Sequence, residues 1–227
     1  VIHKNPMSKI KRRKPKTDKR IVPLDMATIK NLADGFAPRW QIVVWIGFFT
    51  GMRPSEVLGL TWDRLDFENQ EITVDRQLSR DSKKIFADHL KTSKSYRKIP
   101  FSPYLQRLLL EHRDQHGLGP HALILQNRSG NVWRYKDASA MFRLIARPLG
   151  FDKGEGMHQL RHTCASVLIK LGNNAKQIQE WLGHESILET MDTYGHLFPR
   201  DLHEVSERLD AYVVGQLEIQ HEQRKLA

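Results

Sequence analysis

Apolar residues recur every three or four positions along most of this chain, and this spacing predicts a mainly helical fold. The run WQIVVWIGFFTG, residues 40–51, is apolar on every side, which is typical of a helix buried in a core. Elsewhere only one face is apolar, and Asp, Pro or Gly marks the ends. The predicted helices cover residues 25–35, 40–51, 103–117, 135–148 and part of 154–172, with shorter ones from Pro54, up to Gly183, from Ser186 and beyond Pro199.

A central part of the chain alternates apolar and polar residues instead, which predicts strands of a small antiparallel sheet. The fold class expected from the whole pattern is α+β, mainly α: a helical bundle with a small antiparallel sheet. The expected strands are residues 71–74, 85–90 and 96–100, with residues 91–95 as a turn, and residues 122–126 are a further candidate before a turn at Ser129-Gly130.

The helix within residues 154–172 carries candidate chemistry near its start. His158 and Arg161 are three residues apart and are expected to share one face, opposite the apolar one. A helix start that follows glycines favours an anion, and a cationic pair strengthens that preference. The predicted buried stripe on the other face is Leu160, Cys164, Val167 and Leu171.

Two breaks in the helical pattern place polar residues on turns. Pro54 keeps Arg53 out of the helical region, so Arg53 lies on a bend between two helices, where it could serve a site or simply pair with Glu56. Near the carboxyl end, Gly183 should end one helix.

Ser186 and Glu189 read as a capping box that starts the next helix. Along one straight helix, Tyr194 would lie ~15 Å from His184. The turn after His184 instead lets the second helix carry Tyr194 back toward it.

Charge changes this picture mainly at the amino end. The formal net charge is +10, and residues 1–20 hold nine Lys or Arg and one Asp, a net of +8, which leaves +2 for the rest. Such a run is either a solvated, disordered segment or an arm laid on a phosphate backbone, and both readings stay open. The basic turn near residue 94 is likewise either a solvated sheet edge or a DNA contact. The candidate DNA contacts are Lys11, Arg12, Arg13, Lys14, Lys94 and Arg97.

Several classes of protein are disfavoured. Cys164 is the only cysteine, so an internal disulfide is impossible, and this fits a reducing compartment. The longest apolar run, residues 42–49, is too short to span a bilayer, and no signal-peptide pattern opens the chain. His158 and His162 have the spacing of a zinc-protease helix, but Gln159 stands where that motif needs Glu. We therefore expect no metal, no cofactor and no membrane partner.

The remaining candidates suit phosphodiester chemistry. Arginines clamp phosphate oxygens bidentately and stabilise the charge of a transferring phosphoryl group. A tyrosine hydroxyl can attack phosphorus, but its reference pKa of ~10 calls for a neighbouring proton acceptor such as imidazole. A lysine can protonate the leaving sugar oxygen. The set consists of Arg53, His158, Arg161, His184 and Tyr194, with one lysine.

Four blocks of the chain, TGMRPSEVLGL, KTSKSYRKIP, HQLRHT and LGHESILETMDTYGHL, resemble the tyrosine recombinase (phage integrase) family in order and spacing over residues 21–200. The resemblance implies the catalytic-domain fold of that family, which agrees with the helical bundle and small sheet. It also implies that Arg53 and Arg161 bind the scissile phosphate, and that Glu56 supports the site.

The same resemblance implies the proton-transfer roles. Lys91 would be the hairpin lysine that acts as general acid, and Tyr194 would be the nucleophile. His158 and His184 would assist proton transfer and hydrogen bonding at the phosphate. The implied reaction is site-specific recombination of DNA through a 3′-phosphotyrosyl intermediate.

The implied partners are double-stranded DNA and further copies of the chain, in a homotetramer on paired sites. Family members carry a separate amino-terminal core-binding domain, which we expect to be missing here, with residues 1–20 as the basic linker and 21–200 as the catalytic domain. The expected location is the cytoplasm of a bacterial host, on its DNA. The alternatives are a type IB topoisomerase, which places Lys where this chain has His158, and a DNA-binding regulator without chemistry.

The last segment, residues 201–227, is predicted to be a helix with an apolar seam. Such a seam must be covered, either by the chain's own body or by a neighbouring protomer in an exchange of identical elements. The residues of the seam are Leu202, Val205, Leu209, Val213 and Leu217.

Overall fold

The computed structural model describes residues 21–79, 84–90, 92–117, 119–127, 129, 131–152, 155–199 and 201–226. The helices are α1 (Met26–Asp34), α2 (Pro38–Thr50), α3 (Pro54–Leu58), α4 (Pro103–His116), α5 (Tyr135–Ala146), α6 (His158–Lys170), α7 (Ala175–Leu182), α8 (Ile187–Tyr194) and α9 (Leu202–Leu226). Short 3-10 turns cover Trp62–Arg64, Ser93–Ser95, Arg147–Leu149 and Gly195–Leu197. The strands are β1 (Leu65–Asp66), β2 (Glu71–Val74) and β3 (Arg97–Pro100).

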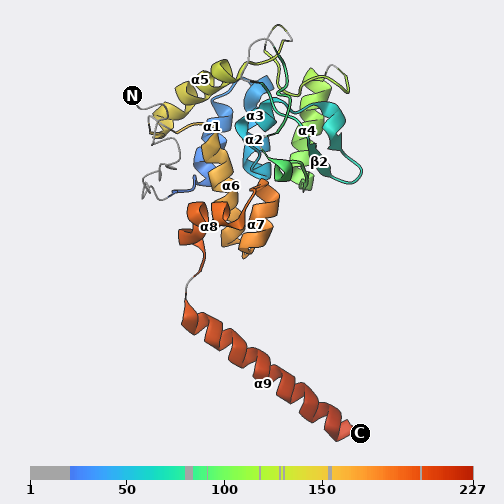
Figure 1. Cartoon of the computed structure of the whole chain (residues 1–227), viewed down its shortest axis with the longest axis vertical. Coiled ribbons are helices and arrows are strands. Elements are labelled where there is room, and N and C mark those ends of the chain that lie inside the picture. The colour runs from blue at the N-terminus through green and yellow to red at the C-terminus, as the bar shows by residue number, and fades with distance from the viewer. Residues whose placement is uncertain are drawn as a thin grey trace, which may run out of the picture.

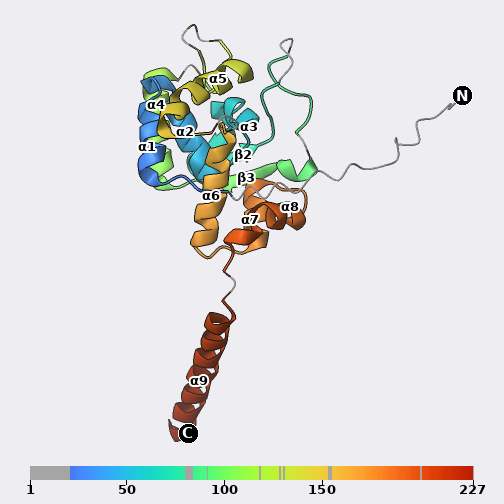
Figure 2. The ribbon, with the colours of Figure 1, turned by 90° about the vertical axis from the view of Figure 1, so that its left-hand side faces the viewer.

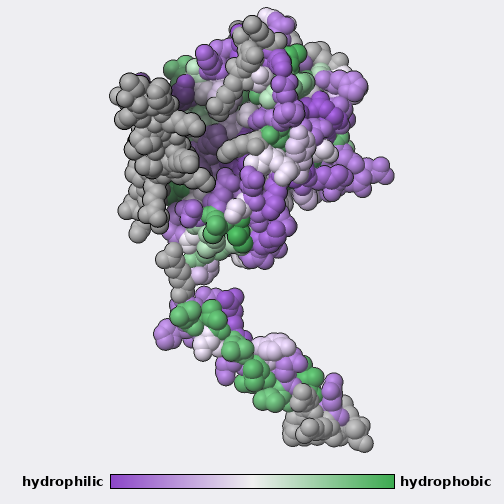
Figure 3. Space-filling view, in the orientation of Figure 1, coloured by the Kyte–Doolittle hydropathy of each residue, from purple (hydrophilic) through white to green (hydrophobic). Residues whose placement is uncertain are grey.

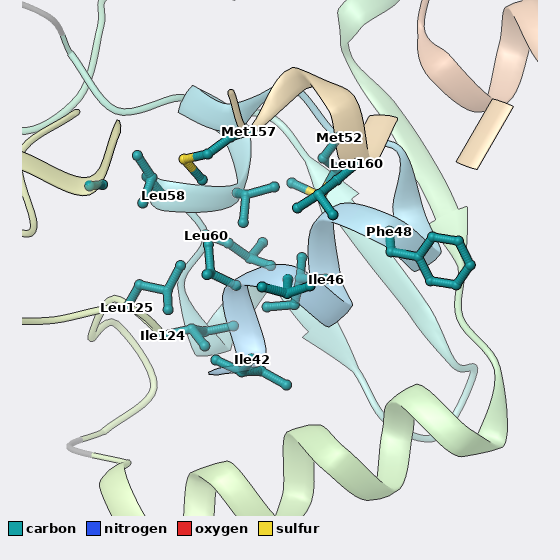
Figure 4. Packing of buried hydrophobic residues seen from close by; sticks show 14 of the residues in the cluster. Ile42, Ile46, Phe48, Met52, Leu58, Leu60, Ile124, Leu125, Met157 and Leu160 are labelled. Atoms are coloured by element: carbon teal, nitrogen blue, oxygen red, sulfur yellow. The ribbon is translucent and has the colours of Figure 1, made fainter. Parts of the chain in front are cut away.

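Helix α2 is the centre of the core and contacts α1, α3, α4 and α6. Its sequence is apolar on nearly every side, and Val43, Val44 and Ile46 have no exposed surface. Figure 4 shows Ile46 pointing into a cluster that α3, α6 and the segment after α4, with Ile124 and Leu125, complete. Each such side chain contributes roughly 1.5–3 kcal/mol through burial. The predicted buried helix is therefore confirmed, and it is the platform on which the turns around it are fixed.

The sheet differs from the prediction in one strand. Its order is β1-β2-β3, all antiparallel, with Ile72 paired to both Leu65 and Ile99. The predicted strand 85–90 is wrong: this segment makes a single bridge, between Leu78 and Phe86. Its apolar residues do not form one buried face, because Ile85 is exposed. The segment before β2 supplies the third strand instead.

The candidate strand 122–126 is also absent as a strand. It makes only isolated bridges, from Leu123 to Thr61 and from Gln126 to Val132. Ile124 and Leu125 are both buried, so this stretch enters the core without the alternation of a strand.

Helix α6 is enclosed on more sides than its sequence pattern indicated. Leu160 and Cys164 are buried as predicted, but Leu171, the last member of the predicted stripe, is 73% exposed because it lies at the end of the helix. Arg161 was expected on the open face, yet it is buried. Packing of α6 against α2 on one side and α7 on the other explains this difference.

The turn between α7 and α8 forms as predicted. Gly183 ends α7 in the left-handed conformation, with φ of +66°. Ser186 caps α8, although its hydroxyl accepts from the amide of Leu188 rather than from that of Glu189. Figures 1 and 2 show α6 running down to α7 and α8, which lie side by side at the lower end of the main body.

Helix α9 points away from the rest of the molecule (Figure 1). The whole predicted seam is exposed, from 45% at Val213 to 79% at Leu202. Figure 3 shows apolar side chains following one another along this helix. Packing of the seam on its own body is therefore not what this structure shows. Among the described residues, no helix combines the length and the apolar character that crossing a membrane requires.

Gly51 gives a test of how tightly α2, α6 and α7 meet. Its φ is +61°, and a Cβ there would lie 2.7 Å from Cδ2 of Leu182 and 3.2 Å from Sγ of Cys164. We expect Gly51→Ala to lower the free energy of unfolding by roughly 2–5 kcal/mol, since backbone strain and overpacking add.

The matched control is Gly172→Ala. Gly172 also has a positive φ, +88°, but its Cβ would meet nothing within 4 Å. Its cost should be only the backbone strain, about 1–2 kcal/mol. Urea denaturation of both variants measures the difference, and equal losses would contradict the close packing at Gly51.

Candidate active site

A buried carboxylate organises the site. Glu56, in α3, is 1% exposed, and its two oxygens accept from Arg53 Nη1 at 2.9 Å and from Arg97 Nη2 at 3.0 Å. Burial by itself would raise the pKa of Glu56, but the charges of Arg97 and Arg53 hold it below its ordinary value. Glu56 is therefore ionised, and it fixes both guanidinium groups.

Arg53 lies on the predicted bend, immediately before α3. Its backbone amide donates to Glu56 at 2.9 Å, so the carboxylate caps the helix as well as pairing with the side chain. Nη1 also donates to Ser95 Oγ at 3.2 Å, and Nη2 donates to the carbonyl of Gly183 at 3.0 Å. Arg53 thus links three parts of the chain that are far apart in the sequence.

Arg161 enters from α6. Its Nη1 donates to the carbonyl of Gly51 at 2.8 Å, directly before the bend that carries Arg53. Burial lowers its pKa to about 10, and the positive charge of Arg53 acts in the same direction. The group is still protonated at neutral pH. Arg53, Arg97 and Arg161 together exceed the single charge of Glu56, which leaves a positive cluster that suits an anion.

The hydroxyl of Tyr194 lies inside this cluster. Tyr194 is 1% exposed, and its Oη is hydrogen-bonded to His162 Nδ1 at 2.9 Å. Burial raises the pKa of Tyr194 to about 12, against the charge of Arg161, which lowers it. Burial also lowers the pKa of His162 to about 4, helped by His158 and Arg161. The hydroxyl therefore keeps its proton in this conformation.

His162 is the functional candidate that sequence reasoning missed. Its spacing from His158 suggests only a metal ligand, which Gln159 disfavours. The available signal was its place one turn after His158 and directly after Arg161 in the same helix. Among the described residues, no group of His, Cys, Asp and Glu is arranged to hold a metal ion.

His184 lies on the turn between α7 and α8 and is 5% exposed. Its ring is nearly parallel to that of Tyr194, with centroids 6.3 Å apart. Nδ1 is hydrogen-bonded to Thr190 Oγ1 at 2.8 Å, and Nε2 lies 3.9 Å from the carboxylate of Glu189. Burial lowers the pKa of His184 to about 3, followed by the charges of Arg161 and Arg53.

The other predicted residues are either exposed at the edge of the site or lie outside the described part of the chain. His158 is the exposed first residue of α6, and Lys94 is exposed on the turn before β3. Both border the cluster without the burial of its other members. The predicted residues outside the described part of the chain are Lys91, Lys11, Arg12, Arg13 and Lys14.

Arg97 is a correction to the predicted DNA contacts. Its side chain is 7% exposed, and all three nitrogens donate inward. Nε bonds the carbonyl of Trp181 at 2.9 Å and Nη1 bonds that of Ser95 at 3.0 Å, while Nη2 pairs with Glu56. The guanidinium is thus bonded within the chain at all three nitrogens, unlike a cation that projects from the surface.

The hollows of the described surface include one beside the site and one away from it. One of about 550 Å³ borders the site and is lined by β3 and α7, including Lys94, Arg97, Trp181 and His184. A larger one, about 1180 Å³, lies over α5 and the turn before it and includes none of the predicted site residues. The candidate site therefore lies at the smaller hollow, beside the charged cluster, and not at the larger one.

Together these groups are equipped for transfer of a phosphoryl group to tyrosine: a positive anion site, a buried hydroxyl and an imidazole bonded to it. Comparison with known proteins agrees with this class. The family model for the Phage integrase family matches residues 11–200. The chain belongs to this family.

Among curated proteins, the chain is 26% identical over 220 residues to the ICEBs1 integrase of Bacillus subtilis (strain 168), covering 92% of this chain and 60% of that protein. It is 30% identical over 193 residues to a protein named "Tyrosine recombinase XerC-like" from Caldanaerobacter subterraneus subsp. tengcongensis, covering 76% of this chain and 49% of that protein. The chain thus spans about half to three fifths of the length of these relatives.

Solved structures show the same fold. The Tn1549 transposon integrase in complex with transposon right end DNA matches with a TM-score of 0.70 and 25% identity, covering 92% of this chain and 72% of that one. The catalytic domain of bacteriophage HP1 integrase matches with a TM-score of 0.57 and 23% identity, covering 83% of this chain and 95% of that one. The predicted catalytic-domain fold is confirmed.

The two buried histidines predict acid sensitivity. Both pKa values lie below the ordinary 6.5, at about 4 for His162 and about 3 for His184. The unfolded chain therefore binds protons first, and stability that is complete above about pH 6.5 is lost as the pH falls toward these values. Each histidine contributes a slope of up to about 1.4 kcal/mol per pH unit.

Urea denaturation at a series of pH values measures this slope. We expect His184→Asn, which keeps a polar partner for Thr190 but does not titrate here, to be less sensitive to acid than the parent. An unchanged slope would contradict burial of a neutral His184.

Proposed function

We propose that this chain is the catalytic part of a site-specific DNA recombinase that cleaves and rejoins strands through Tyr194. The observation that carries the proposal is the hydroxyl of Tyr194, hydrogen-bonded at 2.9 Å to His162 within a cluster that Arg53 and Arg161 make positive. Membership of the Phage integrase family supports the same reaction.

The proposed cleavage starts when a DNA phosphodiester binds Arg53 and Arg161. Its negative charge offsets theirs, which lets the pKa of the nearby imidazoles rise and makes His162 a better base. Tyr194 Oη then attacks phosphorus and passes its proton to His162. The bond from phosphorus to the 5′ oxygen breaks, and that oxygen takes a proton from Lys91, leaving DNA joined to Tyr194 through its 3′ phosphate.

Rejoining reverses these steps with a different strand. A free 5′ hydroxyl gives its proton back to the lysine and attacks the phosphotyrosyl phosphorus. The bond from phosphorus to Tyr194 Oη breaks, and His162 returns its proton to that oxygen. No net energy source is required, because each step exchanges one phosphodiester for another. His158 and His184 would hydrogen-bond the phosphate oxygens during both steps.

The partner proposed for this chain is double-stranded DNA. The integrase of Tn1549 is described in complex with transposon DNA, and XerH recombinase is described bound to its difH substrate. We propose that this chain binds DNA in the same way, in the cytoplasm of a bacterial cell, with Lys94 and the basic residues of 1–20 contacting phosphates. Two further partners are proposed on the family resemblance: an amino-terminal core-binding domain and three more protomers in a tetramer on paired sites.

A covalent adduct tests the chemistry directly. A nicked DNA substrate that traps the intermediate, carrying the chain's own site, should give a slower-migrating protein–DNA band in EDTA, because no metal takes part in the proposed steps. Tyr194→Phe should abolish that band, while His162→Ala should reduce it by roughly 10²–10⁴-fold as expected for loss of a general base. A band that persists with Tyr194→Phe would show that another residue is the nucleophile.

The identity of the general acid has its own test. Lys91 is proposed on the family resemblance, and Lys94 is the rival three residues later. A substrate with a 5′-thio leaving group needs little protonation, so it should restore cleavage to Lys91→Ala. Rescue of Lys94→Ala instead would transfer the role to that residue.

Helix α9 is proposed to dock on a neighbouring protomer, since its seam is exposed and must be covered in the working assembly. Deleting residues 202–227 should leave the melting temperature of the main body nearly unchanged, because α9 points away from it. The same deletion should weaken assembly on paired DNA sites, as measured by sedimentation. Loss of the folded body on truncation would contradict the proposed docking and show that α9 packs on its own chain.

A further inference from the structure

Arg97 spans three segments of the site, which Arg53 joins as well. From β3 it reaches back to Ser95 O at 3.0 Å, across to Glu56 at 3.0 Å and over to Trp181 O at 2.9 Å. These partners belong to the turn before β3, to α3 and to the last turn of α7. The planar guanidinium is suited to this task, because its donors point in fixed and different directions.

Each end of this bridge adjoins a proposed catalytic group. Ser95, on one side, shares hydrogen bonds with Thr92 at 3.0 Å and with Arg53 at 3.2 Å, and Thr92 follows Lys91 in the sequence. We name residues 92–95 the lysine turn.

On the other side, the carbonyl of Trp181 lies two residues before Gly183, which itself accepts from Arg53. We name residues 181–184 the histidine turn, since it ends at His184. Arg97 therefore holds the lysine turn and the histidine turn against the same carboxylate that holds Arg53.

The contact between these turns is close as well as polar. A Cβ added at Gly183 would lie 3.0 Å from Cδ and Nη1 of Arg97 and 3.0 Å from the carbonyl of Lys94. The aliphatic part and head of Arg97 thus fill the space between the two turns. A smaller side chain would leave a gap there, and the single nitrogen of a lysine lacks the fixed, spread donors of guanidinium that reach all three partners.

We propose that Arg97 is a positioning residue that keeps the lysine turn and the histidine turn in register about Arg53. This role rests on the proposed cleavage reaction, because it assigns Arg97 to the alignment of the groups that carry out the reaction. Arg97 touches neither the phosphate nor the leaving oxygen. Its loss should disturb proton transfer and geometry at the site while leaving affinity for DNA intact.

Hydrogen exchange of the folded chain tests the positioning without any catalytic readout. The amides of Ser95, Gly183 and His184 bond to Thr92, Glu180 and Gln179, so they report opening of the two turns. In Arg97→Gln, peptides covering both turns should exchange about tenfold faster, while those of β1 and β2 should not change.

The matched control is Lys98→Gln, on the next residue of β3. Lys98 is 64% exposed and pairs with Glu71 on the outer side of the sheet. Its loss should leave the exchange of both turns unaffected. Unchanged exchange in Arg97→Gln, or faster exchange throughout the body, would overturn the proposal.

Cleavage by the same variants then tests the consequence. With Arg97→Gln and Arg97→Lys, cleavage of an ordinary nicked substrate should fall by roughly 10²-fold, as expected when a catalytic group is misplaced by ~1 Å. A substrate with a 5′-thio leaving group should recover part of that loss, because misplacement of the lysine turn then matters less. DNA affinity should stay within about threefold of the parent, since the nitrogens of Arg97 are bonded within the chain.

These outcomes separate the two proposals. A parent protein that forms no adduct would refute the proposed reaction, while hydrogen exchange would still decide whether Arg97 holds the two turns together. A loss of DNA affinity in proportion to cleavage would instead make Arg97 a DNA contact. Equal slowing on both substrates, with both turns closed to exchange, would show that Arg97 does not align the leaving-group side of the site.

Discussion

The buried carboxylate of Glu56 is the constraint on which the rest of the site depends. A charge taken out of water must be neutralised at short range, and removing one partner of such a pair typically costs about 3–5 kcal/mol. Arg53 and Arg97 meet that requirement from two different segments, and Arg161 lies close enough for its charge to act on Glu56 too. The need to neutralise one group thus draws a helix start, a strand and a core helix to one point.

The buried site carries a net positive charge, and its histidines and tyrosine stay uncharged at neutral pH. Arginine charges and desolvation keep His162 and His184 neutral, and burial keeps the proton on Tyr194. The excess positive charge of this cluster favours binding of an anion. A phosphodiester would reduce the repulsion among the arginines and raise the pKa of the imidazoles. His162 would then accept the proton of Tyr194 more readily, which links substrate binding to activation of the nucleophile. Such electrostatic preorganisation can accelerate phosphoryl transfer without a metal in the steps proposed here.

The body and α9 follow different physical rules. In the body, apolar faces are covered by α2 and the elements around it, and the small sheet supplies β3, which carries Arg97. In α9 the apolar seam is covered by nothing in the described chain. Burying such a seam against a partner removes apolar surface from water, which favours association. Assembly, in the proposed recombinase, would then use surface that folding of one chain leaves exposed.

The sequence by itself determined the local structure and the chemical inventory. Gly51, Pro54 and Gly183 act through their own backbone preferences, so the bend at Arg53 and the turn after α7 could be predicted without knowing what packs on them. The types and order of Arg53, Arg161, His184 and Tyr194 pointed to phosphodiester chemistry, because the chemistry of a side chain is a property of the residue itself. Only the tertiary structure decided which polar groups face one another. Arg97 was predicted to be a surface DNA contact, but its side chain is buried and pairs with Glu56. His162 was considered only as a metal ligand, but its ring is hydrogen-bonded to the hydroxyl of Tyr194. The prediction of a strand at residues 85–90 was wrong because sheet pairing is a contact between distant segments, and alternation within one segment does not specify its partner. Burial and pairing depend on neighbours that are remote in sequence, and those neighbours are fixed only when the whole core packs.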